Sequence, residues 1–327
     1  MGISLSAEMR SFAMDGVFTI SRGSRTSSEV VTVTLDDGTY SGRGECVPYP
    51  RYGESVDGVL ADIRSMTNDI SAGLTRQQLQ SAMPPGAARN ALDCAFWDLA
   101  AKREGARVWE LLDLPAPDGL ITAFTIGLDT PEAMREKAQA NADRPLLKTK
   151  LAEAGDIVRV AAVREGAPKA RITLDANEGW SAETYADIVS QLEAYDIMAV
   201  EQPLHADDDA ILADLPHPIP LIADESAHDS ASLAHIVGRY DMVNIKLDKT
   251  GGLTEALELK RRALDQGLGI MVGCMIGSSL AMAPAMLVAM NADIVDLDGP
   301  LLLAEDRKTP IKFDGSRMHT PPRGLWG

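Results

Sequence analysis

The sequence predicts an α/β protein in which a parallel (β/α) barrel follows a smaller N-terminal α+β unit. Its 327 residues exceed what one small core needs, so a barrel with a second domain is the natural expectation. From Ile121 to Asp298, short apolar runs alternate with amphipathic segments, as in repeated strand–helix units. Most runs end in a charged residue, and the consecutive ends from Lys150 to Lys246 lie 22 to 26 residues apart. This near-regular step favours a barrel.

Composition and charge exclude several classes of partner. The hydrophobic content of 45% is that of an ordinary globular protein, and the net charge is −17 with a pI near 4.7. This sign disfavours nucleic acid and anionic membranes as partners. A local cationic pocket can still bind a small anionic substrate. The sequence does not predict an oligomeric state.

Cysteine usage and the N-terminal residues indicate a cytoplasmic protein. Cys46, Cys94 and Cys274 are odd in number and far apart and form no CxxC pair, which is typical of reduced thiols. The first ten residues lack the basic segment and apolar run of a signal peptide. No apolar stretch reaches the roughly 18 residues of a membrane span.

The first third of the chain predicts a sheet followed by helices. Strands are expected at Phe18–Ile20, Glu29–Leu35 and Thr39–Gly44, with polar loops at 21–26 and 48–54. Helices are expected at Ser55–Met66, at Thr75–Ala82 and, after Pro84-Pro85, over a longer stretch with apolar positions at helical spacing. The Pro- and Gly-rich segment 114–119 marks a domain boundary.

The remaining chain predicts eight strands with helices between most of them. The expected strands are Ile121–Ile126, Leu146–Lys150, Arg171–Asp175, Met198–Glu201, Pro220–Asp224, Met242–Leu247, Gly269–Gly273 and Ile294–Leu297. The expected helices include Pro131–Ala142, Ala154–Glu165, Ala182–Glu193 and Leu253–Gln266. A doubly wound sheet is the alternative, but no glycine fingerprint follows a first strand.

Charged residues stand where six of these strands end, which is the edge at which a (β/α) barrel carries its site. They are Lys148, Lys150, Asp175, Glu201, Asp224, Lys246, Asp296 and Asp298. Lys148 and Lys150 point the same way, because side chains in a strand alternate between faces. Two buried ammonium groups are costly unless carboxylates or a metal site lie opposite.

Asp175, Glu201 and Asp224 supply three carboxylates from adjacent strands. Hard oxygen ligands without Cys or His favour Mg²⁺ over zinc, and the ion would offset the mutual repulsion of the carboxylates. Neighbouring acids and amides have weaker claims as ligands. They are Asn177, Glu178, Asp207 and Glu225.

Lysines lie on both sides of this acidic arc, on the second and sixth strands. An ammonium acts as a base only if its pKa is lowered, and a neighbouring cation such as Lys148 or Mg²⁺ would lower it. Two lysines on opposite walls suit removing a proton from one face of a carbon and returning it to the other. Enolase-type sites combine a Lys base with Mg²⁺ in this way. The pattern predicts racemisation or epimerisation.

The chain resembles the muconate-lactonising subgroup of the enolase superfamily over essentially its whole length. The motifs that carry the resemblance are Lys148-Thr-Lys150, Asp175-Ala-Asn177, Glu201-Gln-Pro203, Asp224-Glu-Ser226, the stretch from Asn244 to Gly252, and the helix from Ala91 to Leu99. The resemblance implies a modified (β/α)7β barrel of TIM type with an N-terminal capping domain. The capping domain would span 1–118, with specificity loops near 20–26 and 48–55, and the barrel 119–299. Residues 300–327 would return to the capping domain.

The resemblance also implies roles for residues. Asp175, Glu201 and Asp224 would bind Mg²⁺. Lys150 and Lys246 would be the acid/base pair. Within the subgroup, Asp296-Leu-Asp298 resembles the pattern of dipeptide epimerases, where two carboxylates on one face could bind the free ammonium of a dipeptide.

The expected substrate is therefore a dipeptide such as L-Ala-D/L-Glu from murein peptides. Lys148 would lie beside its α-carboxylate, and Arg22, or else Arg25, would bind its acidic side chain. The alternatives are an N-acylamino acid racemase, an o-succinylbenzoate synthase or a cycloisomerase of the same subgroup. A Schiff-base aldolase using Lys246 and a protein that merely stores a divalent ion are the alternatives from other classes.

Overall fold

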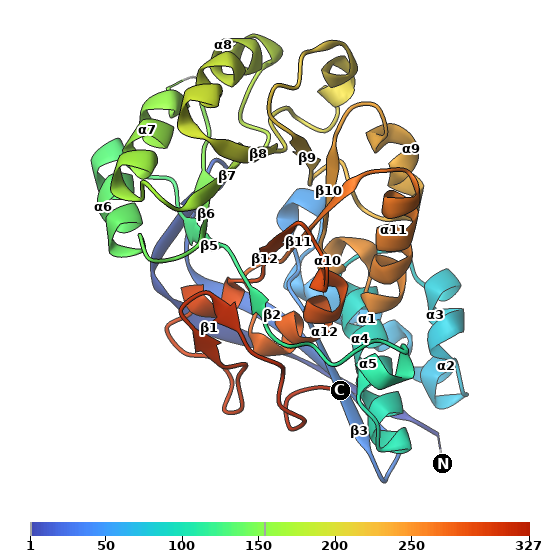
Figure 1. Ribbon diagram of the computed structural model, residues 1–327. Helices are drawn as coiled ribbons and strands as arrows, with labels where there is room; N and C mark the ends of the chain where they lie inside the picture. The colour runs from blue at the N-terminus through green and yellow to red at the C-terminus, as the bar shows by residue number, and fades with distance from the viewer. Residues whose placement is uncertain (1, 154) are drawn as a thin grey trace.

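The computed structural model describes residues 2–153 and 155–327. Its centre is a sheet of eight parallel strands that curls into a ring, which Figure 1 shows almost along the barrel axis. Neighbours in the sheet follow chain order from first to last. The strands are β5 (Phe124–Ile126), β6 (Leu146–Lys150), β7 (Arg171–Asp175), β8 (Ile197–Glu201), β9 (Leu221–Ala223), β10 (Met242–Ile245), β11 (Gly269–Gly273) and β12 (Ile294–Asp296).

The ring closes between its first and last strands. Ala123 N donates to Val295 O at 2.8 Å, and Leu297 N donates to the Thr122 hydroxyl at 2.7 Å. Seven crossovers link the eight strands, and the chain after β12 turns into a short 3₁₀ helix, η5 (Gly299–Leu302). The predicted (β/α)7β barrel is therefore confirmed.

Helices cover the outside of the ring (Figure 1). They are α6 (Pro131–Ala140), α7 (Asp156–Gly166), α8 (Ala182–Leu192), η2 (Glu193–Tyr195), η3 (Asp209–Asp214), η4 (Ser230–Ser232), α9 (Leu233–Ile236), α10 (Leu247–Thr250), α11 (Leu253–Asp265) and α12 (Ser279–Ala289). Only a 3₁₀ helix connects β8 to β9, so this wall is thinner. The predicted start of the second barrel helix, Ala154, lies outside the described residues. No helix in the described part of the chain combines the length and apolarity needed to cross a membrane.

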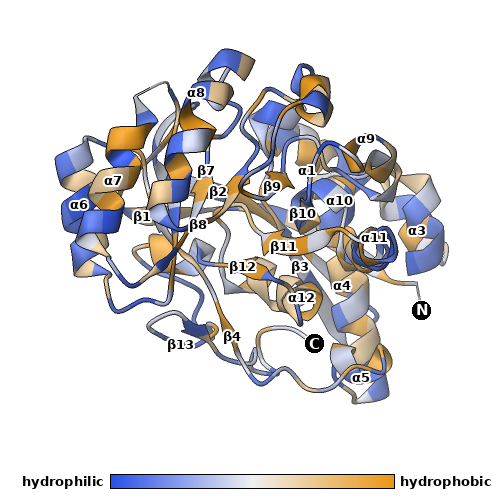
Figure 2. Ribbon diagram, turned by 45° about the horizontal axis from the view of Figure 1, so that its top comes forward, coloured by the Kyte–Doolittle hydropathy of each residue, from blue (hydrophilic) through white to orange (hydrophobic). Residues whose placement is uncertain are grey.

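An apolar layer closes one end of the barrel interior. It consists of Ala123, Leu146, Ala199, Ile222, Met242, Met271 and Ile294, all buried and packed together. Figure 2 shows the strands as apolar and the outer helix faces as polar. Because side chains alternate along a strand, the residues two and four positions further on face the same interior. Those positions include Lys148, Lys150, Glu201, Asp224 and Lys246, so the sequence register places charge at the other end.

The N-terminal unit is a three-stranded antiparallel sheet with helices on one side, and it has its own core. Its strands are β1 (Ser4–Ile20), β2 (Gly23–Asp36) and β3 (Ser41–Cys46). Its helices are η1 (Pro50–Tyr52), α1 (Val56–Ser65), α2 (Thr67–Ser71), α3 (Arg76–Ala82), α4 (Ala87–Glu104) and α5 (Val108–Leu111). Helix α4 lies directly on β3, where a Cβ at Gly44 would overlap Ala91 O. The predicted α+β character of this unit is confirmed.

Two sequence predictions in this unit were wrong in detail. The first strand begins at Ser4 rather than Phe18, because its alternation is interrupted by a bulge between Ala13 and Phe18. The predicted polar loop at 21–26 is a tight turn at Ser21 and Arg22, after which β2 begins at Gly23. The segment is polar, but its backbone pairs with β1, so residues 21–26 form the tip of a hairpin rather than an open loop.

The last residues run back along the N-terminal unit. Trp326 Nε1 donates to Cys94 O at 3.0 Å, and Gly327 N donates to Asp98 Oδ1 at 2.8 Å. A small antiparallel sheet joins this segment to the chain that enters the barrel. Its strands are β4 (Leu120–Ile121), β13 (Phe313–Asp314) and β14 (Arg317–Met318). The predicted barrel strand at Ile121–Ile126 is thus divided, and Ile121 belongs to this outer sheet.

Candidate active site

Three consecutive strands deliver the carboxylates in register. Lys150 pairs with Asp175 across β6 and β7, and Asp175 pairs with Glu201 across β7 and β8. Asp224 directly follows β9. All three acids are at most 1% exposed. Parallel register therefore forms one continuous arc of buried carboxylates at the carboxyl ends of the strands.

Lys150 and Lys246 occupy the two ends of this arc. Lys150 Nζ lies 2.6 Å from Asp175 Oδ2, and Lys246 Nζ lies 2.6 Å from Asp224 Oδ2. Three strands, β7, β8 and β9, separate β6 from β10. In a ring of eight strands, this places the two lysines on opposite walls. Both side chains line the same pocket.

Lys148 lies deeper, among three carboxylates. Its Nζ is 2.7 Å from Glu201 Oε2, 2.8 Å from Asp296 Oδ2 and 3.1 Å from Asp175 Oδ2. The side chain is 2% exposed. An ammonium this buried requires such partners, because an unpaired charge in the interior is very costly.

The carboxylates raise the pKa of two lysines, Lys148 and Lys246. Burial alone lowers the pKa of Lys148, but its three acidic neighbours outweigh burial and raise it well above the ordinary value. Lys246 behaves in the same way, chiefly because of Asp224. Burial and then the charge of Asp175 raise the pKa of Glu201 to about 8. The charge of Lys148 lowers the pKa of Lys246, as expected of a neighbouring cation, but the nearer carboxylates outweigh it.

The pocket contains oxygen atoms that have no hydrogen-bond donor. Of eight buried side-chain N and O atoms that lack a hydrogen bond in the described chain, five are acceptors in or behind the pocket wall: those of Asn177, Glu225 and Asp296 belong to lining residues, and Glu201 and Asn244 contact each other behind them. They are Asn177 Oδ1, Glu201 Oε2, Glu225 Oε2, Asn244 Oδ1 and Asp296 Oδ1. Glu201 Oε2 lies close to Lys148, but the angles are not those of a hydrogen bond. An excess of buried acceptors suits cations and N–H donors.

Asp175, Glu201 and Asp224 fit a hard divalent cation. They offer oxygen donors only, and Glu201 Oε2 has no hydrogen-bond donor in the described chain. Among the described residues, no three His, Cys, Asp or Glu side chains converge closely enough to count as a formed metal cluster. Lysine ammonium groups pair with these carboxylates instead, Lys148 with Asp175 and Glu201, and Lys246 with Asp224.

Two neighbouring side chains, Asn244 and Lys249, fix the carboxylates, and sequence reasoning gave them no role. Lys249 Nζ donates to Asp224 Oδ1 at 2.5 Å and to Asn244 O at 3.1 Å. Asn244 Nδ2 donates to Glu201 Oε1 at 2.7 Å. Both residues belong to the motif that carries the resemblance, and this was the one signal that could have identified them. Each acid therefore keeps one oxygen for the pocket.

Asp296 and Asp298 both line the pocket, as expected, but their surroundings differ. Asp296 Oδ2 pairs with Lys148, while its Oδ1 has no donor in the described chain. Asp298 Oδ2 accepts from Thr125 N at 2.7 Å. Burial, and then the charge of Asp296, raise the pKa of Asp298 to about 7. Two buried acids on one wall favour binding of a cation.

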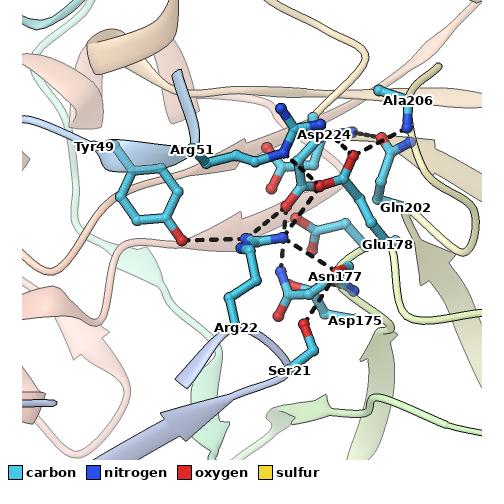
Figure 3. Close-up of polar contacts among 12 residues, drawn as sticks. Ser21, Arg22, Tyr49, Arg51, Asp175, Asn177, Glu178, Gln202, Ala206 and Asp224 are labelled. Atoms are coloured by element: carbon cyan, nitrogen blue, oxygen red, sulfur yellow. Dashed lines mark hydrogen bonds and ion pairs between the residues drawn. The ribbon is translucent and has the colours of Figure 1, made fainter. Parts of the chain in front are cut away.

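The hairpin tip carries Arg22 into the pocket (Figure 3). Its guanidinium lies 2.8 Å from Glu225 Oε1 and donates to Tyr49 Oη at 3.1 Å and to Asn177 O at 3.1 Å. Arg25 lies over the Tyr49 ring, 5.8 Å from its centroid. In residues 2–153 and 155–327, the Arg25 guanidinium has no ion pair or hydrogen bond. Arg22 is thus already paired, and Arg25 is not.

A second arginine joins the N-terminal unit to the barrel. Arg51 Nε and Nη2 donate to the two carboxylate oxygens of Glu178 at 2.7 and 2.6 Å (Figure 3). A bidentate pair of this kind fixes orientation as well as distance. Glu178 therefore binds the loop at 48–55 and does not face the carboxylate arc as a ligand.

Two family models cover most of the chain. The model for "Enolase C-terminal domain-like" matches residues 133–325. The model for "Mandelate racemase / muconate lactonizing enzyme, N-terminal domain" matches residues 8–113.

Relatives of known activity match nearly end to end. The chain is 45% identical over 304 residues to an L-Ala-D/L-Glu epimerase of Escherichia coli (strain K12), covering 92% of this chain and 95% of that protein. It is 44% identical over 302 residues to an N-acetyl-D-glutamate racemase of Pseudoalteromonas sp., covering 91% of this chain and 95% of that protein.

A solved structure matches the fold closely. It is an enolase family member from Agrobacterium tumefaciens with homology to dipeptide epimerases, holding bound sodium and L-Ala-L-Glu. It is 53% identical, with a TM-score of 0.98, over 99% of this chain and 100% of that one. Because the relatives are isomerases, the aldolase and ion-storage alternatives are not retained. The chain belongs to the mandelate racemase/muconate lactonizing enzyme family of the enolase superfamily, whose similar members are epimerases and racemases.

Proposed function

We propose that the protein is a Mg²⁺-dependent dipeptide epimerase that inverts the α-carbon of the C-terminal residue, with L-Ala-D/L-Glu as its substrate. The observation that carries the proposal is the placement of Lys150 and Lys246 at opposite ends of one arc of carboxylates. Inversion at a carbon needs a group that can exchange a proton on each face, and two lysines across a barrel supply that arrangement.

In the proposed reaction, one lysine removes the α-proton and the other returns a proton to the opposite face. Asp175, Glu201 and Asp224 would hold the metal ion, which supplies positive charge to stabilise the enediolate that forms from the substrate carboxylate. Lys148 adds a second positive charge on the same side. Positive charge here also offsets the carboxylates that now raise the pKa of both Lys148 and Lys246.

Lysine placement depends on Gly273, and this gives a testable prediction. A Cβ at Gly273 would stand 2.7 Å from Asn244 Oδ1 and 3.1 Å from Lys246 Cε. Gly273→Ala is expected to lower kcat by about tenfold, because Lys246 must move by a few tenths of an ångström and a shift of about 1 Å costs about 100-fold. Steady-state kinetics measure it.

A matched control for this variant is Gly324→Ala. A Cβ at Gly324 meets only Thr309 Cγ2, at 3.8 Å, which is ordinary contact. This variant should keep the wild-type kcat. An unchanged kcat in Gly273→Ala, with the protein folded, would show that Lys246 is not constrained from this side.

The acceptors at Asp296 and Asp298 support a dipeptide over other substrates of the family. A free ammonium would supply the cation that this wall of the pocket favours, whereas a muconate offers none. For the acidic side chain of the substrate we propose Arg22 as first choice, and Arg25 as the alternative because its guanidinium is unpaired. The similarity to an L-Ala-D/L-Glu epimerase supports the same substrate.

The second candidate is an N-acylamino acid racemase. The relative that is 44% identical acts on N-acetyl-D-glutamate, which has no ammonium. The two candidates share the lysines and the metal ligands and differ at the amino group of the substrate. That group therefore decides between them.

Deuterium exchange tests the proposal. L-Ala-L-Glu incubated in D₂O with enzyme and Mg²⁺ should take up deuterium at the α-carbon of Glu and appear as L-Ala-D-Glu, as followed by NMR. N-acetylation of the dipeptide should reduce the rate by about 100-fold or more, since charged hydrogen bonds to the ammonium are lost. Faster turnover of N-acetyl-glutamate than of the dipeptide would favour the second candidate.

A further inference from the structure

We infer that Asp296 is a positioning residue for Lys148 as well as an acceptor for the substrate ammonium, whereas Asp298 serves the ammonium alone. The inference rests on the proposed function. The two carboxylates then have different roles. Asp296 contacts both the lysine beside the substrate carboxylate and the substrate ammonium, whereas Asp298 contacts only the ammonium.

Lys148 has one partner that remains available when a metal ion is bound. Of its three carboxylates, Asp175 and Glu201 are the proposed metal ligands. A cation bound to those acids competes with the ammonium for the same oxygens and repels it. Asp296, 2.8 Å from Lys148 Nζ, is the acceptor that can hold Lys148 beside the substrate carboxylate.

Asp296 is fixed well enough to do this. It is the last residue of β12, pairs in register with Gly273 of β11 and is 5% exposed. Its Oδ2 donor is Lys148, and its Oδ1 is buried without a donor in the described residues. One carboxylate thus offers one oxygen to the lysine and the other to the pocket.

Asp298 lacks the link to Lys148. Its Oδ2 accepts from Thr125 N, so main chain rather than a charged side chain holds it in place. In the described part of the structure it forms no ion pair with a lysine. Loss of its charge should therefore weaken binding of the ammonium and leave Lys148 where it is.

The single variants should separate in kinetics. With L-Ala-L-Glu as substrate, Asp298→Asn is expected to raise KM by about 10- to 100-fold, the loss expected for a charged hydrogen bond, with kcat within threefold. Asp296→Asn is expected to lower kcat by a similar factor as well as raising KM, because Lys148 loses its anchor. Circular dichroism checks that each variant is folded.

A double-mutant cycle with Lys148→Met tests the link directly. For kcat/KM, and for the dissociation constant of the dipeptide by calorimetry, the double variant D296N/K148M should lose less than the product of the two single effects, because both substitutions remove the positioned Lys148 charge and only Asp296→Asn also removes an acceptor for the ammonium. The double variant D298N/K148M should show the product of the two single effects. If Asp296→Asn does not fold, Asp296→Glu, which moves the carboxylate by one methylene, takes its place in the cycle.

The contrary results are distinct. The inference would be overturned if both aspartate variants raised KM equally without changing kcat, and if both effects multiplied that of Lys148→Met. The epimerase proposal would still stand. Absence of dipeptide exchange and binding in the wild-type enzyme would remove the proposed function, and the inference with it.

Discussion

Lys150→Ala and Lys246→Ala are each expected to lower kcat for epimerisation by about 100- to 10,000-fold, the usual contribution of a positioned acid or base. Each lysine is buried, lies 2.6 Å from a carboxylate at its own end of the arc and lines the pocket from its own wall, so the other lysine serves the opposite face of the substrate carbon. KM should change far less, because neither lysine is proposed to hold the substrate. Steady-state epimerisation of L-Ala-L-Glu, followed by polarimetry, measures the loss.

Lys312→Ala is the matched control for these variants. Its side chain is 71% exposed and pairs with Asp314, and it is not one of the residues that line the pocket. It should retain wild-type kcat. A loss of less than about tenfold in either Lys150→Ala or Lys246→Ala would be incompatible with the proton-transfer role.

Removing the metal ion should have an effect as large as removing a lysine. EDTA is expected to abolish turnover, and added Mg²⁺ to restore it, because the enediolate needs the charge of the ion. Glu201→Gln should weaken Mg²⁺ binding by more than about 100-fold, since loss of even an outer-shell partner costs 10- to 100-fold. Titration calorimetry measures the affinity without relying on turnover.

Asp207→Asn controls for the general loss of negative charge. Asp207 lies near the arc in sequence, but its side chain is 89% exposed. The variant should bind Mg²⁺ as the wild type does. Undiminished turnover in EDTA, or wild-type Mg²⁺ affinity in Glu201→Gln, would contradict the assignment of the ligands.

Much of the barrel could be predicted because alternate residues of each strand face its interior, first apolar and then charged. Leu146, Lys148 and Lys150 lie on one face of β6, and the first of them belongs to the apolar layer while the last reaches the pocket. Ile222 and Asp224 repeat this relation three strands further on. A buried strand that ends in charge indicates a site, because an unpaired charge in the interior is very costly.

The contacts that hold the carboxylates and Lys246 in place could not be predicted from the sequence pattern. Lys249 reaches Asp224 only because the chain makes one helical turn, α10, directly after β10. Gly273 is needed because of a side chain 27 residues earlier, Lys246. Such requirements arise from close approach between strands, and neither residue type nor local spacing reveals them.

The hairpin was harder still. Polar composition at residues 21–26 predicts a loop, but pairing with β1 extends β2 to Gly23. Sequence could name Arg22 and Arg25 as cations near the pocket. It could not show that Arg22 is paired with Glu225, a contact between segments about 200 residues apart. Which arginine meets the substrate is therefore decided by the Arg22→Met and Arg25→Met variants.

Exchange of the α-proton in D₂O by the two lysine variants, starting from each pure epimer, tests the central geometry most directly. With lysines on opposite faces of one carbon, each variant should exchange the α-proton of one epimer and not the other, and the two variants should have opposite preferences. Loss of exchange from the same epimer in both variants, or retention of exchange from both epimers in either one, would contradict the account.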